Sequence, residues 1–95
     1  MARGRGSNSR GGPFSDKVID DVWRKGISTG NANIKKDICG TEIHRNDYGK
    51  QTTYGWEIDH IKPVSKEGSD DISNLQPLQW RNNERKSDTY PWSCR

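Results

Sequence analysis

The chain has 95 residues and a formal net charge of +3, with 27% hydrophobic and 31% charged residues. This length allows one small domain with a thin hydrophobic core, and chains this short often need a metal, a disulfide or a partner for stability. No apolar run approaches the length of a membrane span and no signal peptide opens the chain, so we expect a cytoplasmic protein that does not bind membranes.

Residues 1–13 form a Gly- and Arg-rich arm whose composition predicts disorder. The arm contains Arg3, Arg5 and Arg10 and no acidic residue; removing these three from the 16 basic residues leaves 13 basic against 13 acidic in the rest of the chain. Such an arm attracts polyanions such as nucleic acids without reading their sequence. A solubilising tail is an equally good interpretation. Residues 14–95 are expected to be the folded domain.

Residues 15–26 are predicted to form a helix that packs on the core. Ser15 is a suitable N-cap, and Gly26 is a natural end. An apolar face at helical spacing favours packing on the core over docking to DNA. This face consists of Val18, Ile19, Val22 and Trp23.

Two strands are predicted in the middle of the chain, after an irregular connection at residues 27–37. The segments 39–45 and 53–61 both resemble strands, and the residues between them are rich in turn formers. A hairpin of these two segments is the expected arrangement.

A loop at residues 64–73 and a short apolar step at 74–78 are expected to follow. Residues 79–87 are then predicted to form a short helix on which Asn83 and Lys86 lie three positions apart. The predicted elements together define an α+β domain.

The residues from Asp59 to Lys86 supply the parts of a one-metal phosphodiester hydrolase. Asp59 and Asn83 offer hard oxygen ligands suited to Mg²⁺ or Mn²⁺. His60 could deprotonate a water near neutral pH. Lys86 could lie near phosphate charge, although a solvated helix lysine is about equally expected. Adjacent strand residues point to opposite faces, so Asp59 and His60 can share a site only if the strand bends or ends at His60.

From about Cys39 to Asp88 the sequence resembles the HNH endonuclease family. The motif that carries the resemblance is WEIDHIKPVSKEGSDDISNLQPLQWRNNERKSD. Asp59-His60, Asn74 and Asn83 occupy its three signature positions, which makes the chain an HNN variant. The resemblance implies a ββα-metal core, also called a His-Me finger. It also implies that Asn74 ties down the backbone around the catalytic His60, a place where Asn is common as a turn residue in any case.

The resemblance further implies a metal-dependent DNA endonuclease that nicks one strand with weak sequence specificity. The family spacing from Lys86 selects Asn83 over Asn82 as the metal ligand and leaves Asn82 facing solvent. Arg81 and Arg85 could grip backbone phosphates, and a plain solvated face is equally expected. A protein partner could target the nuclease to its substrate.

Many family members bind a structural zinc through two Cys-x-x-Cys pairs. Cys39 matches one position of the first pair, but no other cysteine of the pattern is present. The chain therefore resembles a zinc-free form. A disulfide between Cys39 and Cys94 is not expected. Two other functions stay open: a non-catalytic nucleic-acid-binding module on the same scaffold, and an RNase.

Overall fold

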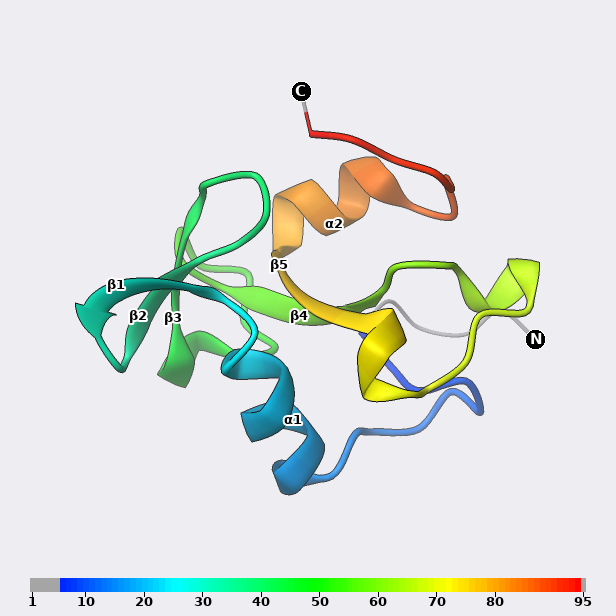
Figure 1. Cartoon of the computed structure of the whole chain (residues 1–95), viewed down its shortest axis with the longest axis horizontal. Helices are drawn as coiled ribbons and strands as arrows, with labels where there is room; N and C mark the ends of the chain where they lie inside the picture. The colour runs from blue at the N-terminus through cyan, green and yellow to red at the C-terminus, as the bar shows by residue number, and fades with distance from the viewer. Residues whose placement is uncertain (1–5, 95) are drawn as a thin grey trace.

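The computed structural model describes residues 6–94, which contain two α-helices and five β-strands (Figure 1). These elements confirm the predicted α+β class, with a helix on the N-terminal side of the predicted core. In chain order they are α1 (Asp16–Trp23), β1 (Ile27–Asn31), β2 (Ile34–Lys36), β3 (Glu42–His44), β4 (Trp56–His60), β5 (Leu75–Gln79) and α2 (Trp80–Lys86).

The strands form two small antiparallel sheets, one in the order β1-β2-β3 and one of β4 and β5. The predicted hairpin of residues 39–45 with 53–61 is therefore wrong, because β3 pairs with β2 and β4 pairs with β5. The segment 27–37, expected to be irregular, contains β1 and β2. All five residues of β1 are exposed, so the strand has no alternation of apolar and polar residues that the sequence could reveal.

Helix α1 forms as predicted. The Ser15 hydroxyl accepts a hydrogen bond from the Val18 amide, which is the contact of an N-cap. The helix ends at Trp23, three residues before Gly26. Its buried residues are Ile19, Val22 and Trp23.

The hydrophobic core lies between α1 and the β4–β5 sheet. The indole rings of Trp23 and Trp56 are in contact, with centroids 5.0 Å apart and planes tilted by 40°. Both indole N–H groups donate to backbone carbonyls, so the two large side chains are buried without loss of a hydrogen bond. The core cluster comprises Phe14, Ile19, Val22, Trp23, Ile43, Trp56, Ile58 and Leu75.

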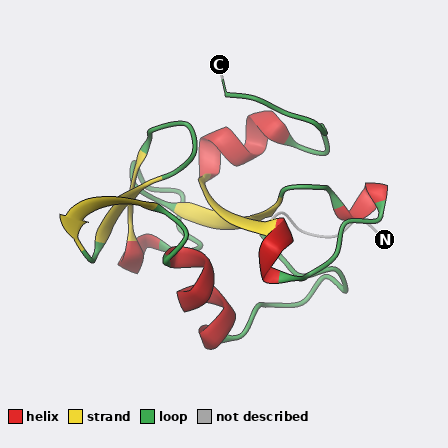
Figure 2. Cartoon of the chain, in the orientation of Figure 1, coloured by secondary structure: helices red, strands yellow, loops and turns green. Residues whose placement is uncertain are grey.

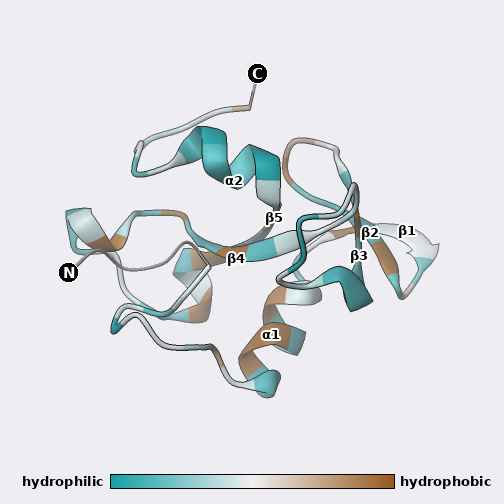
Figure 3. Cartoon of the chain, turned by 180° about the vertical axis from the view of Figure 1, so that it is seen from behind, coloured by the Kyte–Doolittle hydropathy of each residue, from teal (hydrophilic) through white to brown (hydrophobic). Residues whose placement is uncertain are grey.

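Helix α2 covers the opposite face of the β4–β5 sheet, so the sheet lies between the two helices (Figure 1). Figure 3 shows that α2 is hydrophilic along its length, whereas α1 carries hydrophobic residues. The residues that α2 buries are Asn82, Asn83 and Lys86. Buried polar side chains destabilise a fold unless they are paired. A helix that docks through such groups points to a functional site on this face.

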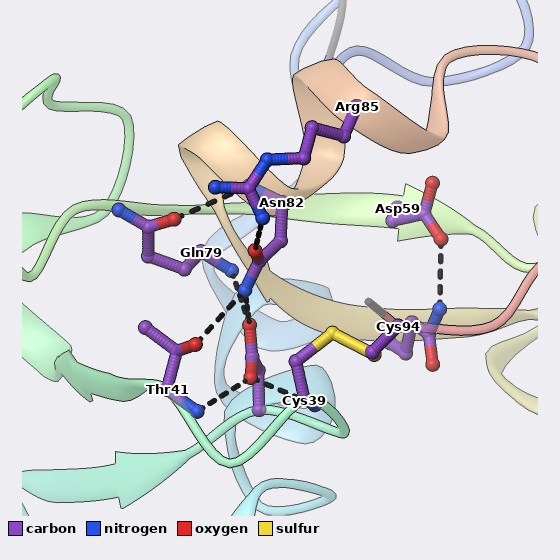
Figure 4. Close-up of a disulfide and its surroundings, with 9 residues drawn as sticks. Cys39, Thr41, Asp59, Gln79, Asn82, Arg85 and Cys94 are labelled. Carbon is purple, nitrogen blue, oxygen red and sulfur yellow. Dashed lines mark hydrogen bonds between the residues drawn. A yellow bond between two sulfur atoms is a disulfide. The ribbon is translucent and has the colours of Figure 1, made fainter.

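A disulfide joins Cys39 to Cys94 and ties the tail after α2 to the loop before β3 (Figure 4). The two residues are separated by 55 positions in the sequence. The expectation that they would not be bonded is therefore wrong. Spacing along the chain says nothing about distance in space, and this pair forms no local motif that could have predicted the bond.

Candidate active site

The end of β4 brings the first two predicted site residues to one cavity. β4 ends at His60, as the strand-parity argument required. A cavity of about 280 Å³ is lined there by Asp59, His60 and, from α2, Asn83. The acidic residues Glu84 and Asp88 line the same cavity. The structure therefore brings these three candidate site residues to one cavity, and their roles stay a prediction.

Both carboxylate oxygens of Asp59 have a partner. Gln76 lies directly opposite Asp59 on β5, and its amide donates to Oδ2 at 2.9 Å. Oδ1 lies 3.2 Å from Nζ of Lys86. Burial raises the pKa of Asp59, and the hydrogen bond from Gln76 and the charge of Lys86 act against that rise. The pair with Lys86 thus favours the charged carboxylate in a buried place.

Lys86 is only 2% exposed, although the sequence suggested a phosphate contact or a solvated lysine. Its Nζ donates to the backbone carbonyl of His60 at 2.9 Å and pairs with Asp59. The solvated alternative is therefore wrong. The side chain holds α2 to the end of β4, next to the two residues on which the chemistry would depend. Its contact with phosphate stays a prediction.

His60 is held through one ring nitrogen. Nε2 lies 2.7 Å from Oδ1 of Asp70, and the ring is 3% exposed. Within residues 6–94 the other ring nitrogen, Nδ1, has no hydrogen bond, and His60 lines the cavity. When Nε2 carries the proton and donates to Asp70, Nδ1 keeps a free lone pair.

Asp70 is a site residue that sequence reasoning missed. It also accepts hydrogen bonds from the backbone N–H and the hydroxyl of Ser9. Partial burial raises the pKa of Asp70, but the hydrogen bonds from His60 and Ser9 outweigh this and hold the pKa below its usual range. Neither contact follows a local spacing rule, since Ser9 and Asp70 are 61 positions apart. The sequence contains no signal that could have joined them.

Residues 6–13 of the N-terminal arm, for which disorder was expected, contact this site, and residues 1–5 lie outside the described residues. The Asn8 side chain accepts hydrogen bonds from the amides of Arg10 and Gly12, which closes a turn. Gly6 lines the cavity of the site. Arg10 is exposed. Arg3 and Arg5, the other two predicted contacts to nucleic acid, lie outside the described residues.

Asn74 fastens the start and end of the loop that follows His60. Its Oδ1 accepts from the Lys62 amide at 2.8 Å, and its Nδ2 donates to the carbonyls of Lys62 and Ser69. The loop closes so tightly that a Cβ at Gly68 would lie 1.7 Å from the Lys62 carbonyl oxygen, which only glycine avoids. This geometry fits the implied task of Asn74, which is to fix the backbone around His60.

The two neighbouring asparagines of α2 face different partners. Asn83 lines the cavity, and its Nδ2 donates to Glu57 on β4 at 2.7 Å. Asn82 was expected to face solvent, which is wrong, because it is 6% exposed. Its Nδ2 donates to Asp37 and to Thr41, both at 3.0 Å (Figure 4). The loop before β3 covers this side of α2, and no helical pattern could show that.

The donor set fits a hard divalent cation. Asp59 and Asn83 line one cavity, and carboxylate and amide oxygens are donors of the kind that Mg²⁺ and Mn²⁺ prefer. Within residues 6–94, no three His, Cys, Asp or Glu side chains lie close enough together to hold a metal ion by themselves. Water and substrate oxygens would therefore have to complete the coordination.

Arg81 and Arg85 are exposed on a second side of α2. The guanidinium of Arg81 lies over the Trp80 ring, 5.1 Å from its centroid, and Arg85 donates to Asn82 at 3.1 Å. Both line a polar cavity of about 400 Å³ beside the disulfide. They are accessible to a phosphate backbone, and contact with one stays a prediction.

Comparison with known proteins places this site in a family. The family model of the HNH endonuclease matches residues 37–89, which is more than half of the chain. The chain belongs to the HNH endonuclease family, so it is related to nucleases and its implied substrate is a nucleic acid. Neither a curated protein nor a solved structure matches it. No helix of residues 6–94 has the length and apolar character that crossing a bilayer requires.

Proposed function

We propose that this protein is a metal-dependent endonuclease that hydrolyses phosphodiester bonds of DNA, one strand at each active site. One observation carries the proposal: Asp59, His60 and Asn83 line a single cavity at the end of β4. A general base and hard oxygen ligands on a shared cavity are what one-metal hydrolysis of a phosphodiester needs.

In this proposal Nδ1 of His60 accepts a proton from the attacking water, and Asp70, bonded to Nε2, stabilises the ring while it is charged. A divalent cation such as Mg²⁺ or Mn²⁺, held by Asp59 and Asn83, would supply positive charge beside the scissile phosphate. Asn74 keeps the loop after His60 in place. Lys86 favours the charged form of Asp59 against the effect of burial and joins α2 to β4.

Substrate binding is proposed to depend on backbone phosphates and so to be weakly specific. The exposed Arg81 and Arg85 on α2, with Arg10 and the other arginines of the arm, supply positive charge for such contacts. Contacts of this kind position a nucleic acid without reading its bases. A protein partner could then direct the enzyme to particular sites.

Cleavage of supercoiled plasmid in the presence of Mg²⁺, followed by addition of EDTA, tests the proposal directly. We expect nicked circles to accumulate with Mg²⁺ and their formation to stop with EDTA. His60→Ala should lower the rate by ~10²–10⁴-fold, the usual contribution of a general base, with little loss of DNA binding. Wild-type nicking by the His60→Ala variant, with its fold verified by circular dichroism, would contradict the assignment.

A second candidate function is a non-catalytic nucleic-acid-binding module. It is favoured by one observation, namely that both carboxylate oxygens of Asp59 are already engaged by Gln76 and Lys86. The same plasmid assay distinguishes the two functions, because the binding module would retard DNA in a gel without nicking it at any Mg²⁺ concentration. Labelled RNA in place of plasmid tests the ribonuclease activity.

A further inference from the structure

We infer that the N-terminal segment of residues 8–14 is a working part of the active site, in which Ser9 positions His60 through Asp70. The inference rests on the proposed function, since it assigns a task to residues around its general base. Ser9 and Asp70 touch no substrate in this scheme. They are positioning residues.

The contacts form an unbroken chain from Ser9 to the ring of His60. The Ser9 amide donates to Oδ1 of Asp70 at 3.0 Å and to Oδ2 at 3.2 Å, and the Ser9 hydroxyl donates to Oδ2 at 2.7 Å. Oδ1 also lies 2.7 Å from Nε2 of His60. Ser9 therefore grips the carboxylate at two points and turns Oδ1 toward the histidine.

The bonds from Ser9 matter because the loop around Asp70 does not fix the rotamer of its side chain. Its side chain is 39% exposed and lies in the connection between β4 and β5, which is mostly loop with two short helical turns (Figure 2). An exposed carboxylate on a loop samples several rotamers. The bonds from Ser9 select the rotamer that meets His60.

The segment that contains Ser9 is itself fixed by hydrogen bonds and by packing on the core. Asn8 closes a turn through bonds to the amides of Arg10 and Gly12, and it also donates to the Pro13 carbonyl. Phe14 follows at once, is buried in the core, and lies 5.9 Å from the His60 ring, centroid to centroid. One short segment thus contacts His60 directly through Phe14 and indirectly through Ser9.

Figure 1 shows the spatial side of this arrangement. The blue N-terminal segment returns past the loop that joins β4 to β5 before it enters α1. The hydrogen bond from Ser9 to Asp70 joins the N-terminal segment to this loop. Ser9 and Asp70 are 61 positions apart, so the bond between them ties the N-terminal segment to the family core at residues 37–89.

The positioning has two measurable results. The Nε2–H proton of His60, which is bonded to Asp70, should exchange slowly with water and give a resolved NMR signal at fixed pH. Turnover should also depend on the bond, because a small displacement of a catalytic group can lower a rate by up to ~10²-fold. Substrate binding should not depend on it, since neither Ser9 nor Asp70 is proposed to contact the nucleic acid.

The test compares Ser9→Ala, Ser9→Thr and Asp70→Ala with two matched controls, Ser65→Ala and Asp71→Ala. Ser65 is exposed in the same loop, and Asp71 has the charge of Asp70 one position on without its bond to His60. The chain has two histidines, so ¹⁵N-histidine labelling gives the ring signals of His60 with those of His44 as an internal reference.

We expect Asp70→Ala to abolish the slowly exchanging His60 signal and to lower kcat by ~10–10²-fold at unchanged KM. Ser9→Ala should weaken the His60 signal and lower kcat by a smaller amount, because the Ser9 amide still donates to Asp70. Ser9→Thr should restore the signal and kcat. The two controls should leave both unchanged. An unaltered His60 signal in Ser9→Ala and Asp70→Ala would overturn the inference, as would an altered signal with unchanged kcat.

The two proposals fail in different ways in this experiment. If the wild-type protein does not nick DNA, the proposed function falls, and the positioning of a catalytic base falls with it. The NMR signal of His60 still decides whether the Ser9–Asp70–His60 contacts exist in solution. If the wild-type protein does nick DNA and the Asp70→Ala variant nicks it equally fast, only the further inference is lost.

Discussion

Asn82 and Asn83 have the same side chain on adjacent positions of α2, yet the fold gives them different partners. Asn82 lies against the loop before β3 and bonds to Asp37 and Thr41. Asn83 lines the cavity at the end of β4. Successive helix positions differ by about 100° around the axis, which is enough to separate a structural residue from a candidate ligand.

Alanine substitutions at these two positions should therefore have separable effects. Asn82→Ala removes the hydrogen bonds that the side chain donates to the buried carboxylate of Asp37 and to Thr41, and should lower the free energy of unfolding by ~1–3 kcal/mol. Asn83→Ala should instead reduce Mg²⁺-dependent nicking, with partial recovery at excess metal. Urea denaturation and a Mg²⁺ titration of activity measure the two effects. Loss of metal response in Asn82→Ala alone would show that the register of ligands is off by one.

The buried pair of Lys86 and Asp59 leads to a second prediction, which concerns the stability of the fold. Lys86→Met should lower the free energy of unfolding by ~3–5 kcal/mol, because it leaves the buried carboxylate of Asp59 without its counter-charge. The double variant Lys86→Met with Asp59→Asn should regain part of the loss. Urea denaturation of both variants provides the measurement. Equal stability of the single variant and the wild type would show that the pair is not formed in solution.

The spacing of the motif was enough to predict which residues meet at the site, and not enough to predict what holds them. Asp59, His60 and Asn83 line one cavity; the first two are adjacent at a strand end, and Asn83 was selected by the family spacing from Lys86. Asp70 and Ser9 could not be predicted, since their contacts join segments with no common period. The burial of Lys86 depends on how closely α2 packs on β4, which a helical wheel does not contain.

Among the elements, both helices were predictable and the strand pairing was not. α1 has an N-cap and an apolar face, and these are local signals. β5 was interpreted only as a short apolar step, because Pro77 interrupts its pattern and strands of a sheet interior rarely contain proline. Because β5 was not recognised as a strand, the segment 39–45 was predicted as the partner of β4. The hairpin prediction failed for this reason.

The disulfide between Cys39 and Cys94 closes a long loop around α2 and the β4–β5 sheet. A covalent link of this length restricts the unfolded chain more than the folded one, and should contribute ~2–4 kcal/mol to the free energy of unfolding. It also fastens the tail beside the polar cavity that contains Arg81 and Arg85.

Reduction of the disulfide should therefore lower the urea midpoint of unfolding measurably. We expect a shift on addition of dithiothreitol to the wild-type protein and none for the variant with Cys39→Ser and Cys94→Ser. That variant should resemble the reduced wild type. An identical midpoint with and without reductant in the wild-type protein would mean that the bond does not form, or does not stabilise the fold.

At the scale of the whole molecule, the N-terminal arm has two proposed tasks, one in substrate binding and one at the site. Its positive charges are suited to phosphates, and residue Ser9 belongs to the contacts around His60. Two deletions separate these tasks. Of the three arginines and Ser9, the deletion of residues 1–5 removes only Arg3 and Arg5. Removal of residues 1–12 takes away Arg10 and Ser9 as well.

Both deletions should weaken DNA binding and its dependence on salt. Each lost phosphate contact lowers the log–log salt slope by about 0.9 units, so the slope should fall by up to ~2 units for the short deletion and up to ~3 for the long one. Only the long deletion should lower kcat. A salt titration of binding and a nicking assay measure these effects, and a slope unchanged by either deletion would remove the arm from the substrate contacts.

The pair of Trp23 and Trp56 in the core has an optical consequence. Two indole rings 5.0 Å apart couple their electronic transitions, so together they give a circular dichroism band that neither ring gives alone. One ring belongs to α1 and the other to β4, and the band therefore exists only while the helix is docked on the sheet. The chain carries its own reporter of that contact, and no dye or attached label is needed to follow it.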